Sequence, residues 1–102
     1  MNNLEMVESI KSTFAKGLAI VVKKNADYAT ETDPFRNFNY AQVLGVTAEK
    51  AILVRTVDKI ARIDNLLTKE HQVTEESIED TLVDAIDYLA ILKALIESKR
   101  SH

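Results

Sequence analysis

The stretch Thr74–Lys99 constrains the fold most, because it carries two lines of packable side chains at helical spacing. The first line recurs every three or four residues, the spacing of a helix buried along one face. Its members are Ile78, Leu82, Ala85, Leu89, Leu92 and Ile96. The second line is acidic in its first half and apolar in its second half, and its members are Glu76, Asp80, Asp84, Tyr88, Ile91 and Leu95. We therefore expect other helices to cover this stretch and the acids to form the mouth of a site.

The carboxylates of the second line also have a purely structural interpretation. Acids in the first turn of a helix complement its dipole and stabilise it by about 0.3–1 kcal/mol each. With Thr74 as N-cap, this explains Glu76 without any function. It does not explain Asp84 and Asp87, which follow the first turn, where Asp has a poor helix propensity. Glu76, Asp80 and Asp84 are therefore candidate site residues, with helix stabilisation as the alternative.

Two further stretches have the same amphipathic spacing and are predicted to be long helices. The first is Asn3–Lys24, with an expected core face of Leu4, Val7, Ile10, Phe14, Leu18 and Val21. The second is Ala48–Thr68, with Thr47 as N-cap and an expected core face of Ile52, Leu53, Val57, Ile60, Ile63 and Leu67. Gly17, inside the first stretch, predicts the close approach of a neighbouring helix.

A short helix, Phe38–Leu44, is expected to end at Gly45, which suits a left-handed C-terminal position. The chain is thus predicted to be a single all-α domain, residues 1–102: a small bundle of three long helices and one short helix. Only two Gly and one Pro in 102 residues, with 46% hydrophobic residues, agree with a folded helical chain. Three long amphipathic helices on so short a chain cannot all cover one another, so we expect a homo-oligomer.

Composition excludes several classes of function. A formal net charge of −3 leaves no basis for stable, nonspecific nucleic-acid binding, which needs basic stripes to neutralise phosphates. The absence of cysteine excludes disulfides and thiolate zinc sites. No apolar run reaches the length of a membrane span and no signal-peptide pattern opens the chain, so we expect no membrane partner and a cytoplasmic protein.

The stretch Asn25–Gln42 is the least periodic and holds four of the six aromatic residues, Tyr28, Phe35, Phe38 and Tyr40. Aromatic rings in such a connection either complete the core or offer flat surfaces to a ligand. Polar groups that could bind a ligand lie beside these rings, at Lys24, Asp27 and Asn37.

The Ala48–Thr68 helix carries a basic stripe, defined as Arg55, Lys59 and Arg62, beside its expected core face. The simplest interpretation is a solvated edge. If this helix packs antiparallel to Thr74–Lys99, however, the basic stripe faces the carboxylates across one cleft. Mg²⁺ prefers one or two carboxylates together with phosphate oxygens and waters. Asp80 and Asp84 could then hold Mg²⁺ while Lys59 and Arg62 hold phosphates, Arg62 in bidentate fashion.

These parts together describe a nucleotide site on a helical bundle, in which Tyr28 or Phe38 could stack a base. The candidate ligand-binding residues are Lys24, Asp27, Tyr28, Asn37, Phe38, Lys59 and Arg62, and the candidate metal ligands are Asp80, Asp84 and Glu76. No P-loop, dinucleotide-binding glycine motif or nucleophile–base pair is present.

Four blocks of the sequence carry a resemblance to a known family. The blocks are KNADYA at 24–29, FRNF at 35–38, ILVRTVDKIARIDNLL at 52–67 and ESIEDTLVDAIDY at 76–88. In order and spacing they resemble small phage and prophage proteins of the nucleotide-modification-associated domain family. That family is similar in turn to MazG-like all-α nucleoside triphosphate pyrophosphatases, which are oligomeric and use Mg²⁺. The MazG-like pattern has a pair of acids on each of two helices, whereas the Ala48–Thr68 helix offers only Asp58.

Three functional hypotheses follow. The first is a phage-type protein that binds a nucleotide or nucleotide-derived ligand, for instance sequestering a host-defence signal without turnover. The second is an enzyme, either a Mg²⁺-dependent MazG-like pyrophosphohydrolase or an accessory to nucleotide modification. The third is a helical protein-interaction module. The low number of carboxylates favours the first.

Overall fold

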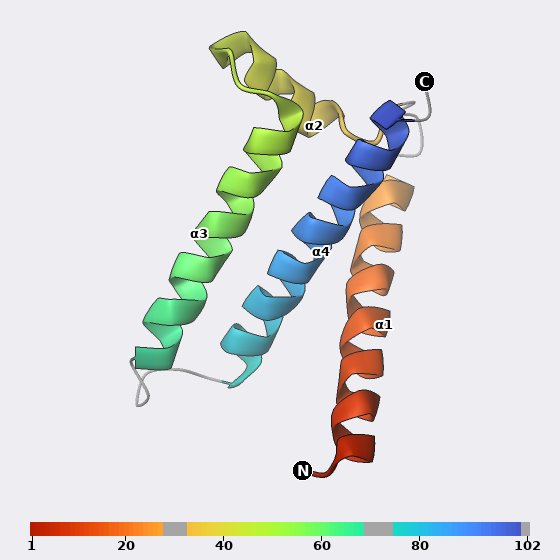
Figure 1. The fold of residues 1–102 in the computed structure, drawn as a ribbon, viewed down its shortest axis with the longest axis vertical. Helices are drawn as coiled ribbons and strands as arrows, with labels where there is room; N and C mark the ends of the chain where they lie inside the picture. The colour runs from red at the N-terminus through yellow and green to blue at the C-terminus, as the bar shows by residue number, and fades with distance from the viewer. Residues whose placement is uncertain (28–32, 69–74, 101–102) are drawn as a thin grey trace.

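The computed structural model describes residues 1–27, 33–68 and 75–100. Every regular element within these ranges is helical, which confirms the all-α prediction (Figure 1). The elements are α1 (Asn3–Asp27), α2 (Arg36–Asn39), the 3₁₀ helix η1 (Tyr40–Leu44), α3 (Ala48–Thr68) and α4 (Glu75–Arg100). Two of the residues singled out above, Tyr28 and Thr74, lie outside the described ranges. None of the described helices is long and apolar enough to cross a membrane.

The predicted helix boundaries agree closely with the structure because local side chains set them. The N–H of Lys50 donates to Thr47 Oγ1 at 3.2 Å, which confirms Thr47 as the cap of α3. Gly45 closes η1 at φ 75°, the left-handed conformation, and its N–H donates to the Gln42 carbonyl at 2.9 Å. The α1 helix runs three residues past Lys24, the end predicted for it. The predicted short helix begins two residues early, at Arg36, and continues as the 3₁₀ turn η1.

The Asp33 carboxylate fixes the entry into α2. One oxygen accepts the N–H of Phe35 at 2.9 Å, and the other accepts Asn39 Nδ2 at 2.8 Å. These bonds tie Asp33, which precedes α2, both to the residue before the helix and to its last residue, Asn39. Phe38, in the middle of α2, is thereby directed into the core, where it is buried.

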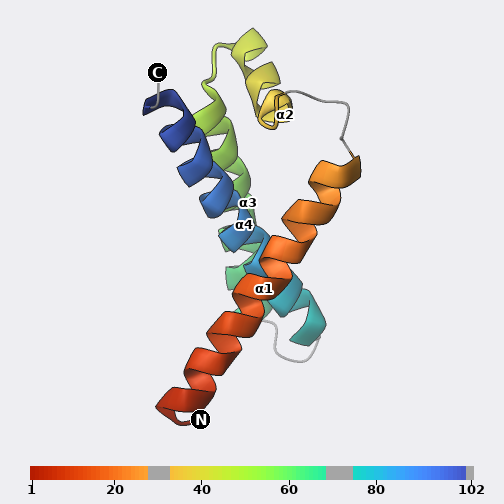
Figure 2. The same cartoon turned by 90° about the vertical axis from the view of Figure 1, so that its right-hand side faces the viewer.

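The α3 and α4 helices lie side by side and run in opposite directions, which is the condition under which the basic stripe was expected to face the carboxylates (Figure 1). On its other side α4 packs against α1, and no packing between α1 and α3 occurs within the described residues. Figure 2 shows α1 crossing α4 obliquely, so that the first turns of α1 project beyond the other helices. The α4 helix is thus the central element of the fold.

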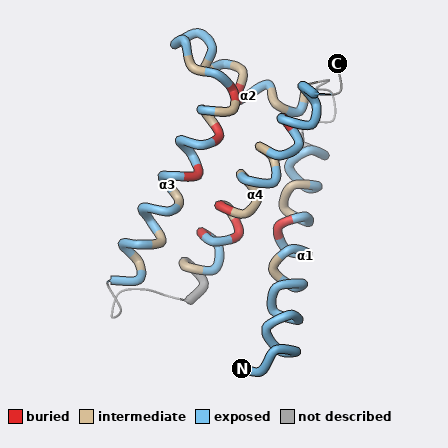
Figure 3. The backbone as a smooth tube through the Cα atoms, viewed as in Figure 1, coloured by how far each residue is buried: buried red, intermediate tan, exposed pale blue. Residues whose placement is uncertain are grey.

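The hydrophobic core is small and lies where α2, α3 and α4 meet (Figure 3). Its buried members are Phe38, Ala48, Ile52 and Leu95. Tyr88, Ile91 and Leu92 of α4 pack against it and are partly buried. The core therefore uses the apolar half of the second line on α4, together with Leu92 of the first. At the far end of this core the Lys99 Nζ donates to Glu49 Oε1 at 2.7 Å, and this bond lowers the pKa of Glu49.

The predicted core faces of the three long helices are wrong in large part. On α1, every predicted core residue except Val21 is exposed, Leu4 by 71% and Leu18 by 65%. On α3, Ile52 is buried and Ile63 half-buried, while the other four predicted residues are exposed: Leu53, Val57, Ile60 and Leu67. On α4, Ala85 is buried and Ile78 and Leu92 are half-buried, while Leu82, Leu89 and Ile96 are exposed. Helical spacing identified apolar faces correctly, but many of these faces meet no other helix among the described residues.

Gly17 confirms the predicted close approach, and its neighbour is a charged side chain. A Cβ at Gly17 would lie 2.5 Å from Asp87 Oδ1, so the missing side chain makes room for the Asp87 carboxylate on α4. One turn earlier on α1, Lys16 Nζ donates to Asp80 Oδ1 at 3.0 Å. The contact between α1 and α4 is therefore close and partly polar.

A double-mutant cycle tests this contact. Ala in place of Gly in an open helix stabilises it by about 1 kcal/mol, but Gly17→Ala displaces the Asp87 carboxylate. We therefore expect Gly17→Ala to stabilise the protein in an Asp87→Ala background and to lose at least about 1 kcal/mol of that gain in the wild type, as coupled neighbours do. Urea unfolding of the four proteins measures the coupling. Equal effects of Gly17→Ala in both backgrounds would contradict it.

Candidate functional site

A cavity of about 450 Å³ opens between α1, α2, α3 and α4. It exists because α1 and α3 flank α4 without packing on each other, so that the angle between them is not filled. Cations and amides line it from three elements: Lys24 and Asn25 on α1, Asn37 on α2, and Arg55 and Lys59 on α3. The remaining lining residues are Ile20, Val21, Pro34, Phe38, Asp84, Asp87, Tyr88 and Ile91. Its size is ordinary for a small-molecule site.

Two aromatic rings form the floor of the cavity. The Phe38 and Tyr88 rings meet edge to face, with centroids 6.4 Å apart and planes at 82°. The Arg55 guanidinium lies over the Phe38 ring, 5.2 Å from its centroid. Phe38 is thus occupied on one face and buried, while Tyr88 is only partly buried. The ring contacts fix Arg55 and Tyr88 at the cavity wall.

A cation and a carboxylate face each other across the α3–α4 contact, as predicted. Lys59 Nζ lies 3.1 Å from Asp84 Oδ2, and both side chains are about one third exposed. An ammonium has three donors, so this pairing leaves Lys59 able to donate to a further oxygen. Lys59 and Asp84 therefore lie together in the cavity. The sequence analysis predicted that Lys59 binds phosphate and that Asp84 binds a metal ion.

Asp87 is the second carboxylate on the cavity wall. Burial raises its pKa above the ordinary value of 3.8, and the Asp84 charge raises it further, while Lys24 acts in the opposite direction. The direction follows from geometry, because Asp87 is pressed against α1 at Gly17 and stands one helical turn from Asp84. Three cations therefore line the cavity, Lys24, Arg55 and Lys59. Two carboxylates line it as well, Asp84 and Asp87, and the pKa of Asp87 is raised.

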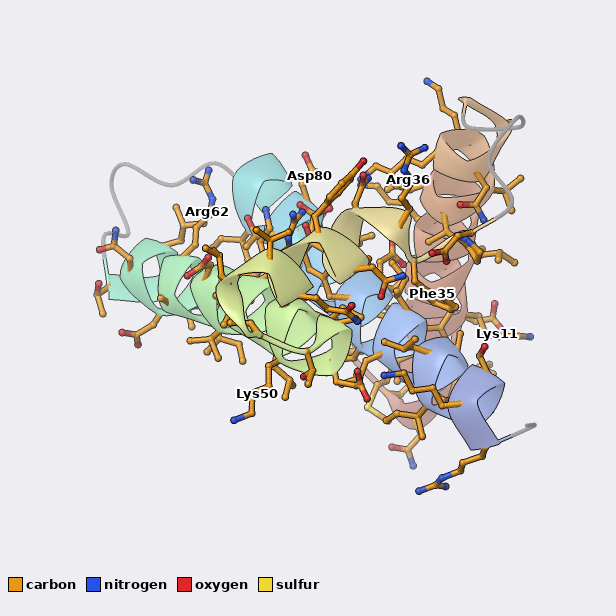
Figure 4. All side chains as sticks on the ribbon, turned by 90° about the horizontal axis from the view of Figure 1, so that it is seen from above. Lys11, Phe35, Arg36, Lys50, Arg62 and Asp80 are labelled. Atoms are coloured by element: carbon orange, nitrogen blue, oxygen red, sulfur yellow. The ribbon has the colours of Figure 1, made fainter. Side chains whose placement is uncertain are left out.

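A shallow hollow adjoins the cavity and shares Arg55, Lys59 and Tyr88 with it. Its other lining residues are Asp58, Ala61, Arg62 and Asn65. All three members of the basic stripe therefore border one surface. Arg62 Nε donates to Thr81 Oγ1 on α4 at 3.3 Å. Figure 4 shows Arg62 on one side of α3 and Lys50 on the opposite side.

The structure thus brings together Lys24, Asn37, Phe38, Lys59 and Asp84 of the predicted site residues, with Arg62 next to them. It directs Asp80 elsewhere, to Lys16 on α1. Tyr28 and the side chains of Asp27 and Glu76 lie outside what the structure describes. Arg55, Asp87 and Tyr88 line the cavity although the predicted site did not include them. The sequence contained a pattern that could have identified each of them. Arg55 is the first residue of the basic stripe, Asp87 lies one turn past Asp84, and Tyr88 follows Asp84 on the second line.

The described carboxylates do not form a metal cage. No three acidic or histidine side chains gather among the side chains that the structure describes. Asp80 and Asp84, predicted to share one Mg²⁺, instead pair with Lys16 and Lys59 on different helices. A Mg²⁺ ion at the cavity would depend on oxygens of a ligand, with Asp84 and Asp87 as the available carboxylates.

Comparison of the chain with family models, curated proteins and solved structures finds no match. The phage-family resemblance and the functions it implies therefore stay predictions, and the residues of the site are the basis for a functional assignment.

The raised pKa of Asp87 predicts a pH dependence of stability. Because the folded protein holds the Asp87 proton more tightly than the unfolded chain does, ionising this group costs stability. The favourable contribution is present below pH 3.8 and is lost as the pH rises through the raised pKa. We expect Asp87→Asn to be more stable than the wild type at pH 7, with the difference shrinking towards pH 4.

Thermal unfolding across pH 4–8 measures this difference. Asp80→Asn is the matched control, since it removes a carboxylate on the same helix that is paired with Lys16. We expect no gain in stability at pH 7 from Asp80→Asn. A pH-independent difference between Asp87→Asn and the wild type would contradict the assignment.

Proposed function

We propose that this protein binds a nucleotide or nucleotide-derived ligand in the cavity and holds it without turnover. The observation that carries the proposal is that one cavity joins Lys24, Arg55 and Lys59 to the Tyr88 ring. A phosphate needs several cationic donors, and a base needs a flat apolar surface. The cavity and the adjoining hollow offer both at neighbouring positions.

The basic stripe supports a phosphate-binding role. Arg55, Lys59 and Arg62 stand at i, i+4 and i+7, and all three line the hollow. Asp58 is the acid among the lining residues there. A ligand whose ring lies in the cavity can therefore extend its phosphates along the stripe, where charge-assisted hydrogen bonds are strongest.

Tyr88 is a better candidate than Phe38 for stacking a base. The Phe38 ring has the Arg55 guanidinium over one face and the edge of Tyr88 as a neighbour, and it is buried. Tyr88 lines both the cavity and the hollow, so its ring stands where the two meet. Asn25 and Asn37, also on the cavity wall, are suited to hydrogen bonding with a base edge or a sugar.

Sequestration is favoured over hydrolysis by the use made of the acids. Asp84 is paired with Lys59 and Asp80 with Lys16, so both carboxylates already serve contacts between helices. A metal-dependent pyrophosphohydrolase needs carboxylates free to hold Mg²⁺ at the reacting phosphate. The enzyme hypothesis then requires a change of contacts when a ligand and Mg²⁺ bind together. Asp84 would have to leave Lys59, and Asp87 would have to turn away from α1.

We further propose that the chain acts as a homo-oligomer. Its accessible surface is 7958 Å², whereas a compact monomer of 11.5 kDa exposes about 5,800 Å². Its radius of gyration is 15.8 Å, against about 13 Å for a compact domain of this length. The excess of about 2,000 Å² per chain falls in the range that subunits of obligate dimers bury.

Lys59 gives the sharpest test of ligand binding. Lys59→Ala removes a phosphate donor and leaves Asp84 unpaired to repel an anion, so both effects act in one direction. We expect the affinity for a nucleoside triphosphate such as ATP or GTP, or for a cyclic dinucleotide, to fall by about tenfold to a hundredfold. Isothermal titration calorimetry measures the affinity. Arg62→Ala should weaken binding in the same direction if the phosphates follow the stripe.

Lys93→Ala is the matched control, since it removes one positive charge from an exposed lysine that pairs with Glu97 on the same helix. We expect this variant to bind like the wild type. Equal losses in Lys59→Ala and Lys93→Ala would mean that net charge alone accounts for binding. No binding of any of these compounds, and no nucleotide retained by protein purified from cells, would refute the proposal.

Asp84→Asn separates sequestration from catalysis. For a protein that only binds, removing this acid should tighten binding of an anion severalfold, because a repelling charge is lost and Lys59 is released. EDTA should leave the affinity unchanged. Mg²⁺-dependent release of pyrophosphate from a nucleoside triphosphate, abolished in Asp84→Asn, would instead establish the enzyme.

A further inference from the structure

The α3–α4 hairpin has a broad apolar face that no other described part of the chain covers. We name it the hairpin back face. It consists of Leu53, Val57, Ile60 and Leu67 on α3 and Leu82, Leu89 and Ile96 on α4, all of them between 36% and 60% exposed. Because the two helices lie side by side, these two lines form a surface that is two helices wide.

The hairpin back face points away from the cavity. Two successive steps along a helix turn the side chain by about 200°, so residues two apart point to nearly opposite sides. On α3, Leu53 and Ile60 each stand two residues before a member of the basic stripe, Arg55 and Arg62. On α4, Leu82 stands two residues before Asp84, and Leu89 stands midway between Asp87 and Ile91. All of these partners line the cavity or the hollow.

The spacing on this face is that of a seam between helices. Leu53, Ile60 and Leu67 recur every seven residues, and so do Leu82, Leu89 and Ile96. Apolar residues repeated in heptads direct a helix into the grooves of neighbouring helices, as in coiled coils and four-helix bundles. Among the described residues no helix packs on these repeats, since α1 contacts α4 on another side, at Asp80 and Asp87.

We infer that two copies of the chain pair through their hairpin back faces to form a four-helix bundle, built from α3 and α4 of each copy. The inference rests on the proposed self-association and adds its interface and symmetry. A second copy is the occupant that the surface supports, because it brings an identical heptad face and the same excess of exposed surface. A twofold arrangement buries both faces at once and leaves each cavity on the outside of the dimer.

The rival interface is a single-helix stripe on α1, consisting of Leu4, Val7, Ile10, Phe14 and Leu18. Its members recur every three or four residues, so it is continuous along α1, but it is only one helix wide. Lys11, next to Ile10, places a charge at the edge of this stripe, where it lies 3.7 Å from Glu8. The hairpin back face is two helices wide, which is why it is assigned to the dimer.

Light scattering coupled to gel filtration tests the inference with matched variants. We expect the wild type to elute as a dimer of about 23 kDa, twice the 11.5 kDa chain. Ile60→Lys and Leu89→Lys place a charge in the proposed interface, and each should raise the dimer dissociation constant at least about 30-fold. Leu18→Lys places the same charge on the exposed α1 stripe and should leave the dimer intact.

A lysine variant that unfolds would also lose the dimer, so chemical cross-linking provides a second test that introduces no charge. The chain contains no cysteine, so Leu89→Cys and Leu18→Cys each carry a single thiol. A short bis-maleimide should yield a covalent dimer with Leu89→Cys and much less with Leu18→Cys. The reverse result, or a dimer lost in Leu18→Lys and kept in Leu89→Lys, would move the interface to α1 and overturn the inference.

The remaining outcomes separate this inference from the proposals on which it rests. A monomeric wild type at micromolar concentration would refute self-association and with it the interface. Failure of ATP, GTP and a cyclic dinucleotide all to bind, with no nucleotide retained by the purified protein, would refute the proposed function and leave the dimer results standing. If both hold, ATP affinity should be equal in the wild type and in Leu89→Lys, because the cavity lies on the opposite side of the hairpin.

Discussion

The structure depends on the position of α4, which must contact α1 on one side and α3 on the other. Its apolar residues do not serve both contacts, because Leu82, Leu89 and Ile96 stay exposed. Leu95, Tyr88 and their neighbours serve the core with α2 and α3, so the contact with α1 is made in part by Asp80 and Asp87. Exposed ion pairs such as Lys16–Asp80 contribute at most about 1 kcal/mol, whereas apolar burial increases with area. The α1 helix is consequently held less firmly than α3, and it needs Gly17 to approach at all.

The cavity follows from the same constraint. Because α1 and α3 both pack on α4 and not on each other, an angle remains between them, and α2 closes one end of it with Phe38. Side chains that would be solvated on isolated helices, such as Lys24 and Lys59, then converge on one space. Two acids share that space, and the burial of Asp87 disfavours its charged form. The result is a cavity in which positive charge outweighs negative charge, next to a partly exposed ring, in a protein whose overall charge is negative.

The proposed assembly and the proposed ligand binding would use opposite sides of the α3–α4 hairpin. Arg55, Lys59 and Arg62 occupy one side of α3, while Leu53 and Ile60 occupy the other. If the apolar side is covered by a second copy, the folded state of each chain depends on protein concentration, as in other dimers whose subunits are incomplete alone. The proposed ligand contacts lie on the opposite side of the hairpin and use no residue of a second copy.

The helices, their ends and their polar faces could be predicted from the sequence, because short-range chemistry decides them. Thr47 and Gly45 set a start and an end through their own hydrogen bonds and backbone angles. The basic stripe was likewise visible, since Arg55, Lys59 and Arg62 share one face of any α-helix. The prediction failed where two faces of one helix competed. Periodicity shows that Leu89 and Leu95 each lie on an apolar line, but it does not say which line meets a neighbour within the same chain.

The tertiary structure decided which residues make the site. Asp80 and Asp84 are one turn apart and were predicted to act together, yet the small rotation between them directs one to α1 and the other to α3. Asp87 lies on the cavity wall where α1 crosses α4 obliquely (Figure 2), and Tyr88 lies there through its contact with Phe38 of α2. Crossing angles depend on how whole side-chain surfaces fit, over distances that no local pattern spans. Local sequence therefore determined which groups each helix carries, and packing between helices determined which of those groups meet.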